Sequence, residues 1–179
     1  PHRTPVPVVI LAIDEPTFQE LQQTWPFPRS VHAALLERLR ADGALAVGLD
    51  IVFADPTTEA EDAALDRTMA QVGQGLPVVL ASTREKIDSA NAALWMDIQP
   101  LQRFLDAGAD AGDAGVEPDD DFVVRRAPVA REGFALRLAQ RVTEARGQTP
   151  ALHHFDWIGY RGPRGTFDTR SYYQALEPG

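Results

Sequence analysis

The sequence predicts one α/β domain over residues 1–179, with a central, mainly parallel sheet of βαβ units and helices on both of its faces. Continuous apolar runs, rich in β-branched residues, lie at 8–13, 45–53 and 77–82 and are typical of buried strands. Segments with apolar residues at helical spacing separate these runs. A chain of 179 residues is also long enough for one domain with a substantial core.

The first βαβ unit connects the runs 8–13 and 45–53 through a helix expected over about 30–42. Apolar residues of this helix repeat every four positions, and Gly43 ends it. A short helix over 17–23 precedes it. Because the joints are short, we expect the two strands to be parallel neighbours with a right-handed crossover between them.

An aromatic and proline-rich segment, Trp25-Pro26-Phe27-Pro28-Arg29, lies between the first strand and the main helix. Its two prolines fix φ and impose an extended path on the chain. We therefore expect Trp25 and Phe27 to be held as rigid aromatic side chains and Arg29 to be directed at the helix entrance.

A second crossover follows. Thr58 and Glu61 have the spacing of a capping box and open a helix whose apolar face continues to Val72. The run 77–82 then forms the third strand. The C-terminal half allows an antiparallel edge, because a valine-rich strand there is expected to be half of a hairpin. The elements expected in this half are a short helix at 100–108, a strand at 122–131, a helix at 134–147, a strand at 152–159 and a closing segment at 167–176.

The composition excludes several functional classes. The net charge of -9 and the pI near 4.8 make nucleic acid and anionic membrane surfaces unfavourable partners. The chain has no cysteine, which excludes zinc ribbons, iron–sulfur clusters, thiol catalysis and disulfides. No apolar run reaches the roughly 18 residues that cross a bilayer. Since the chain begins at Pro1 and not at Met, we expect it to be a piece of a longer protein with membrane segments outside it.

Carboxylates gather at the predicted strand ends, where ligands bind in open parallel sheets. Asp14 and Asp55 follow strands, and Asp50 lies inside one, where an unpaired charge is costly. Arg29 is the expected partner of Asp50, because a guanidinium clamps a carboxylate with two hydrogen bonds. Three interpretations stay open: a structural ion pair with helix capping, an oxygen site for Mg²⁺ or Ca²⁺, and a ligand pocket. The candidate ligand-binding residues are Asp14, Trp25, Phe27, Arg29, Asp50 and Asp55.

A second group of acids, Asp119, Asp120 and Asp121, lacks the alternating spacing and the glycine of a calcium loop. We expect a structural, solvated turn in which Asp119 or Asp121 pairs with Arg125 or its neighbour Arg126.

No other metal or cofactor site is expected. His153 and His154 are adjacent, so on a strand they face opposite ways and cannot bind one ion. The chain has no Gly-Lys-Ser/Thr phosphate loop and no Gly-x-Ser-x-Gly elbow, which removes the support for a nucleotide fold or a hydrolase triad.

Several of these segments resemble the type-two CHASE domain, the cyclases/histidine kinases associated sensory extracellular domain. The resemblance covers nearly the whole chain, and its specific part is the Trp-Pro-aromatic-Pro-Arg segment with the downstream Asp-x-x-Phe. At Phe122 the chain departs from the family pattern, in which glycine is expected. The matching segments are Asp14-Glu15, Trp25 through Arg29, Gly43-Ala44, Asp50 through Phe53, Asp119 through Arg126, and Gly159 through Pro163 with Phe167 and Ser171-Tyr172.

The resemblance implies a non-enzymatic sensory domain on the periplasmic or extracellular face of the cell membrane, in a bacterial transmembrane receptor. Its cytoplasmic output would be an adenylate cyclase, a histidine kinase, a Ser/Thr kinase or a cyclic-dinucleotide enzyme. The partners would be a small-molecule or protein stimulus and, since such outputs usually work in pairs, a second copy of the receptor.

Two further functions remain open on the sequence alone. A metal-dependent hydrolase of phosphate esters would use Asp14, Asp50 and Asp55 around Mg²⁺ or Mn²⁺. A scaffold that only dimerises would need no ligand.

Overall fold

The computed structural model describes residues 8–88, 93–126, 133–149 and 157–177. The chain forms two compact units, and we describe each by itself. The first combines residues 1–28 with 159–179, and the second comprises residues 29–158.

The larger unit is built on three parallel strands. Strand β3 (Val78–Asp88) pairs with β2 (Val47–Leu49) through its first residues and with β5 (Asp110–Asp113) along its other edge. The register places Leu80 beside Leu49 and beside Ala111. These parallel pairings confirm the predicted α/β class.

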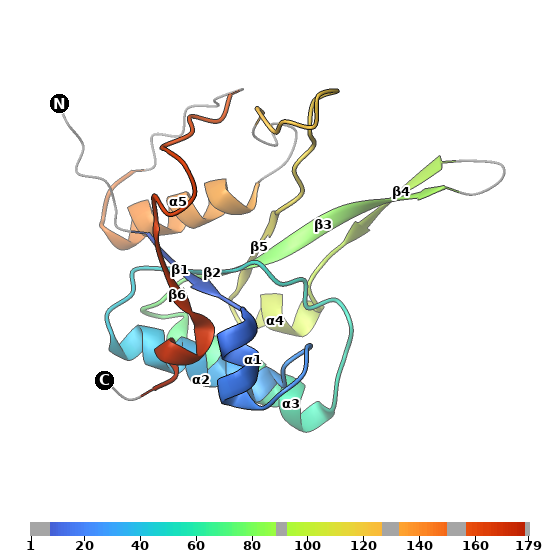
Figure 1. Cartoon of the computed structure of the whole chain (residues 1–179). Coiled ribbons are helices and arrows are strands. Elements are labelled where there is room, and N and C mark those ends of the chain that lie inside the picture. Colours follow the sequence, from blue (N-terminus) through green and yellow to red (C-terminus); the bar gives the residue numbers. More distant parts are fainter. Residues whose placement is uncertain (1–7, 89–92, 127–132, 150–156, 178–179) are drawn as a thin grey trace. The chain divides into compact units, whose positions relative to one another are not determined.

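Helices cover both faces of this sheet (Figure 1). Helices α2 (Arg29–Ala41) and α3 (Glu59–Val72) pack against each other on one side, and α5 (Phe134–Ala145) packs against β2, β3 and β5 on the other. The short α4 (Gln102–Asp106) contacts α3. The predicted arrangement of helices on both sheet faces is therefore confirmed.

The core lies where these layers meet. Its largest fully buried side chains come from α2, α3 and β3, with Phe53 from the segment after β2, Leu76 from the segment before β3 and Phe104 from α4. On the opposite face α5 approaches the sheet at two glycines. A Cβ atom on Gly112 would lie 2.5 Å from the Cα atom of Phe134, and one on Gly48 would lie 2.7 Å from the Phe134 ring. The absence of side chains at these two positions is what lets the start of α5 lie directly on β2 and β5.

An antiparallel strand, β4 (Ala93–Ile98), pairs with residues 83–88 of β3. The sequence predicts the antiparallel edge near 122–131 instead. In the described part of that range, Arg126 forms an isolated bridge with Trp157, and residues 127–131 lie outside the described part. Most of the strand expected at 152–159 also lies outside it.

The smaller unit pairs the two ends of the chain. Strand β1 (Val9–Ala12) runs parallel to β6 (Asp168–Ser171), and α1 (Glu15–Leu21) contacts the 3-10 helix η1 (Tyr172–Ala175).

This pairing corrects a central expectation, because β1 and β2 belong to different sheets and do not pair with each other. The apolar run of β1 predicts a buried strand, yet Val9 and Ile10 are 51% and 45% exposed. A run of β-branched residues favours a strand but does not select its partner, and here the partner is a segment from the opposite end of the chain.

Candidate functional site

The predicted ligand-binding residues are divided between the two units. Asp14, Trp25 and Phe27 lie in the smaller unit, and Arg29, Asp50 and Asp55 lie in the larger one.

Arg29 is the first residue of α2 and its side chain is almost fully buried, with the residue 7% exposed. Its Nη2 donates to the carbonyl oxygen of Asp55 at 3.0 Å, and its Nε lies 3.6 Å from Oδ1 of Asp62. The guanidinium carbon lies 4.4 Å from the centre of the Phe53 ring, a cation–π distance. The expected Arg29–Asp50 pair is therefore wrong. Asp50 follows the end of β2 and is exposed, so it needs no buried partner.

Asp62 of α3 is the acid that Arg29 meets inside the protein, and it is 2% exposed. Its carboxylate accepts hydrogen bonds from the backbone N–H and the hydroxyl of Thr57 at 3.0 and 2.7 Å. Arg103 of α4 lies 4.0 Å away and also binds Glu59 and Asp66 of α3. Burial raises the pKa of Asp62, but the Thr57 hydrogen bonds and the two guanidinium groups outweigh it, so the pKa lies below its ordinary value. We call Arg29, Asp62 and Arg103 the buried charge network.

His32 lies next to this network on α2 and is buried edge-to-face against Phe53, with ring centres 5.3 Å apart. Burial, and then the positive charge of Arg29, lower its pKa to about 4. The imidazole is therefore neutral near pH 7, as a side chain packed beside a buried cation must be.

Asp62 and Arg103 are not among the residues predicted from the sequence, although α3 carries a signal for Asp62. Asp62 shares the apolar face of that helix with Leu65, Met69 and Val72, all of which are buried. An acid on a buried helix face requires a basic partner. No comparable signal marks Arg103, because its contacts with α3 depend on the path of the chain between residues 72 and 102.

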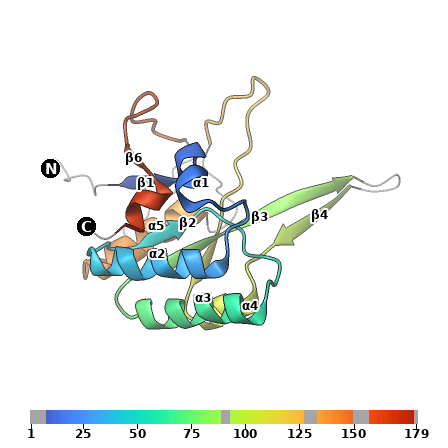
Figure 2. The ribbon, with the colours of Figure 1, turned by 60° about the horizontal axis from the view of Figure 1, so that its bottom comes forward.

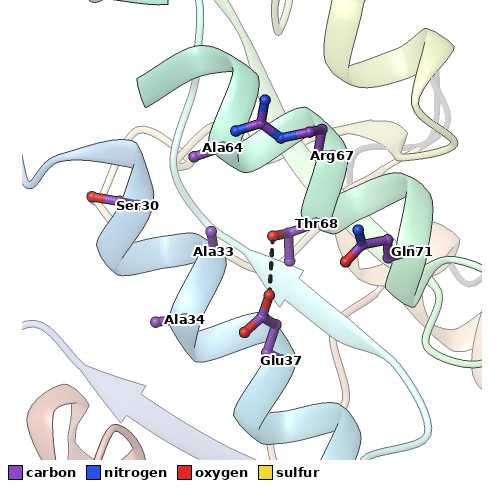
Figure 3. A pocket seen from close by; sticks show the side chains of 8 residues that line it. All are labelled: Ser30, Ala33, Ala34, Glu37, Ala64, Arg67, Thr68 and Gln71. Carbon is purple, nitrogen blue, oxygen red and sulfur yellow. Dashed lines mark hydrogen bonds between the residues drawn. The ribbon is translucent and has the colours of Figure 1, made fainter. Parts of the chain in front are cut away.

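A groove of about 320 Å³ runs between α2 and α3 (Figure 3). Alanines and polar side chains from both helices line it; Ala33 and Thr68 are buried, and Ala34, Glu37, Arg67 and Gln71 are exposed. Thr68 of α3 donates to Glu37 of α2 at 3.4 Å across the groove. At one end the N–H of Ser30 donates to the carboxylate of Glu61 at 2.7 Å, so α3 caps the first turn of α2. The lining residues are Ser30, Ala33, Ala34, Glu37, Ala64, Arg67, Thr68 and Gln71.

The predicted aromatic segment packs within the smaller unit. Phe27 is buried, and its ring centre lies 5.4 Å from Phe18 and 6.1 Å from Tyr172. Trp25, which precedes a cis proline, contacts the edge of Phe27 at 5.5 Å and is half exposed. Phe27 thus belongs to the core of this unit, and Trp25 is the member of the pair that solvent or a ligand can reach.

Asp14 caps α1 and connects it to β6. Its carboxylate accepts from the N–H and the hydroxyl of Thr17 at 3.1 and 2.7 Å, and from the hydroxyl of Ser171 at 2.7 Å. The Ser171 hydrogen bond, followed by those from Thr17, holds the pKa of Asp14 below its ordinary value. These contacts give the carboxylate a structural role.

The acid turn is organised by one arginine. Arg125 donates to Asp119 at 3.0 Å and to both oxygens of Asp121 at 2.8 and 2.6 Å. Between the acids and the arginine, Phe122 has a φ of 63°, a left-handed conformation that favours glycine, and its side chain is 89% exposed. The position where the family pattern expects glycine therefore keeps the backbone geometry of glycine while carrying an aromatic side chain.

In the part of the chain that the structure describes, no three His, Asp or Glu side chains come together as a metal site. The interpretation as a metal-dependent hydrolase gains no support from this geometry.

The sequence pattern of the CHASE2 domain matches residues 1–177. The chain belongs to the CHASE2 domain family. CHASE2 domains are extracellular sensory domains of receptors and are not catalytic, which agrees with the sensory interpretation of the sequence. The comparison with curated proteins found no match, and neither did the comparison with solved structures. None of the described helices of this CHASE2 domain has the length and apolar character of a membrane span.

Proposed function

We propose that this CHASE2 domain is the signal-input module of a bacterial transmembrane receptor, located on the periplasmic or extracellular face of the cell membrane. Membrane helices outside the sequence would transmit its state to a cytoplasmic adenylate cyclase, histidine kinase or Ser/Thr kinase. The observation that carries this proposal is the family match over residues 1–177, because it covers almost the whole of a chain whose family is sensory and extracellular.

The groove between α2 and α3 is the place in the larger unit where we propose that a small-molecule stimulus binds. Its volume of about 320 Å³ is at the lower end of the range for ligand sites, and its lining offers Arg67, Thr68 and Gln71 as polar contacts. Of the six residues proposed from the sequence, the exposed ones remain candidates for ligand contact, each within its own unit: Trp25 in the smaller unit, and Asp50 and Asp55 in the larger one.

A population shift between two arrangements of α2 and α3 would transmit the signal. Arg29 and Asp62 join the first turns of these two helices, so a ligand that changes the helix spacing acts against this ion pair. The bias then reaches a second copy of the receptor, because cyclase and kinase outputs work in pairs.

The location is tested by labelling the full-length receptor with a membrane-impermeant maleimide. This chain has no cysteine, so Gln71→Cys places one thiol on an exposed helix position. We expect labelling in spheroplasts whose inner membrane is intact. Labelling that requires lysis of the inner membrane would refute the extracytoplasmic location.

The sensory role is tested by the output activity of the same receptor in its native membrane. Deleting the domain should abolish the dependence of output on culture conditions while leaving the catalytic domain active. If regulation survives the deletion, the domain is not the input module.

A further inference from the structure

Strands β3 and β4 form a two-stranded ribbon that extends beyond the rest of the sheet (Figure 2). The pairing of β3 with β2 ends at Leu80 and its pairing with β5 ends at Ser82. From Thr83 to Asp88, β4 is the strand that pairs with β3 in the described part of the chain. A hairpin of two strands is marginally stable in water unless a third strand or a helix covers it.

Apolar side chains make this ribbon unusual for an exposed surface. Leu94, Trp95 and Met96 are 61%, 50% and 48% exposed. Successive side chains of a strand point to opposite faces, so Leu94, Met96 and Ile98 lie on one face of β4, and Trp95 and Asp97 lie on the other. Three consecutive exposed apolar residues on an uncovered strand are a feature that soluble proteins avoid unless another surface covers them.

The two edges of the ribbon differ in charge. The β3 edge carries Arg84, Glu85 and Lys86, and charged side chains of this kind protect an edge strand from further pairing. The β4 edge carries a single charge, Asp97, whose carboxylate lies 3.5 Å from Arg84. The guanidinium of Arg84 also lies 5.0 Å from the Trp95 ring. Thus β4 is the edge that lacks protection.

We propose that β4 pairs antiparallel with β4 of a second copy of this chain, with Met96 opposite the same residue of the other copy. Antiparallel pairing about a two-fold axis keeps each residue beside one of the same face. With Met96 on the axis, Leu94 lies beside Ile98 and Trp95 lies beside Asp97. The alternative with Asp97 on the axis brings two carboxylates together and is unfavourable. The interface is isologous and joins the two sheets into one.

A second copy fits this edge better than a lipid bilayer does. The outward backbone groups of β4 need hydrogen-bond partners, which another strand supplies and hydrocarbon does not. The net charge of -9 also opposes contact with anionic lipids. The same charge makes most surfaces of two copies repel each other, and β4 is a segment where apolar residues replace the acids.

The size of the contact predicts a weak dimer. A strand of six residues is about 20 Å long, and a single added strand pair falls below the roughly 1,000 Å² of a stable interface. Tethering to one membrane raises the effective concentration towards the millimolar range, which is enough to populate such a dimer. The populated dimer therefore rests on the proposed receptor function, which supplies the membrane tether. The choice of β4 and of the register rests on the strand geometry alone.

Site-directed disulfide cross-linking of the full-length receptor in its membrane tests the register, with any cysteines outside this chain replaced by serine. Met96→Cys should cross-link to itself, because opposed Cα atoms lie about 4.5–5.5 Å apart, within disulfide range. Leu94→Cys is the matched control, since two copies of it would lie about 13 Å apart along the strands. We expect the cross-linked fraction of Met96→Cys to exceed that of the control about fivefold or more. Coexpressed Leu94→Cys and Ile98→Cys receptors should cross-link to each other.

Equal cross-linking of Met96→Cys and Leu94→Cys, or none by either, would overturn the proposal. If Met96→Cys does not cross-link, and a fluorophore attached to the same cysteine in a separate sample reports an apolar environment, the bilayer is the occupant. That result would also overturn the proposal. The impermeant labelling of Gln71→Cys is measured separately, so the strand pairing can fail while the sensory location stands.

Discussion

The strongest test of the buried charge network is the substitution Arg29→Ala. It removes the 3.6 Å ion pair with Asp62, the 3.0 Å hydrogen bond to the Asp55 carbonyl oxygen and the cation–π contact with Phe53. It also leaves the Asp62 carboxylate buried with less compensation. Removing one partner of a buried ion pair costs about 3–5 kcal/mol, because the remaining charge stays desolvated.

For Arg29→Ala we expect the lower end of that range, about 3 kcal/mol, since Asp62 keeps both Thr57 hydrogen bonds and Arg103 at 4.0 Å. For a chain of this size such a loss lowers Tm by about 6–12 °C. The matched control is Arg38→Ala on the same helix, which removes an exposed pair with Asp42 at 3.0 Å and should cost less than about 1 kcal/mol.

Urea unfolding followed by circular dichroism gives both free energies. The double variant Arg29→Met with Asp62→Leu should recover much of the stability lost in Arg29→Ala, because it leaves no uncompensated charge. If Arg29→Ala is no more destabilising than Arg38→Ala, the network is not a stabilising feature and the reasoning fails. The output of the folded Arg29→Ala receptor then separates the two roles of the residue: normal signalling identifies a structural residue, and lost signalling in folded protein identifies a site residue.

Three further predictions concern pH, packing and backbone strain. The pKa of His32 is about 4 in the folded state and 6.5 in the unfolded chain. The contribution of His32 to the free energy of unfolding is therefore complete above pH 6.5 and is lost as the pH falls towards 4, by about 3 kcal/mol in all. Thermal unfolding of His32→Leu over this range should lack this pH-dependent loss of stability. Gly112→Ala should destabilise by about 2 kcal/mol or more, since its Cβ would lie 2.5 Å from a backbone atom of α5, whereas Gly75→Ala, with nothing within 4 Å, should be neutral or slightly stabilising in urea titrations. Phe122→Gly should stabilise the chain by about 0.5–1 kcal/mol, because the left-handed φ of 63° costs an aromatic residue more free energy than glycine loses in conformational entropy. The Phe122 side chain is 89% exposed, so removing it sacrifices little buried surface. A lower unfolding midpoint for this variant would show that the ring contributes to stability.

Local features of the chain were predictable because they depend on neighbours in sequence. Thr58 accepts a hydrogen bond from the N–H of Glu61 at 3.3 Å at the start of α3, as the spacing predicted. Gly43 has a φ of 80° just after α2, which agrees with its predicted role as the helix end. The apolar run at 77–82 became the central strand β3. The family resemblance was confirmed over residues 1–177.

Even the confirmed cap shows where local reasoning stops. A capping box sends the glutamate side chain back to its own helix. Here the Glu61 carboxylate instead accepts from Ser30 N–H at 2.7 Å and caps α2. The packing of the two helices decides whether the Glu61 carboxylate binds within α3 or binds α2. The sequence of α3 alone does not predict this choice.

By itself the sequence determined the α/β class, the positions of the principal helices and of β3, and the family, because apolar period and capping chemistry act over a few residues. Only the tertiary structure decided that β1 pairs with β6, that Arg29 meets Asp62 and not Asp50, and that β4 adds an antiparallel strand. Each of these contacts joins two segments that become neighbours only when the whole chain folds. Burial and charge specify that a strand or an ion needs a partner, but several candidates satisfy the requirement, and the packing of the whole chain selects one.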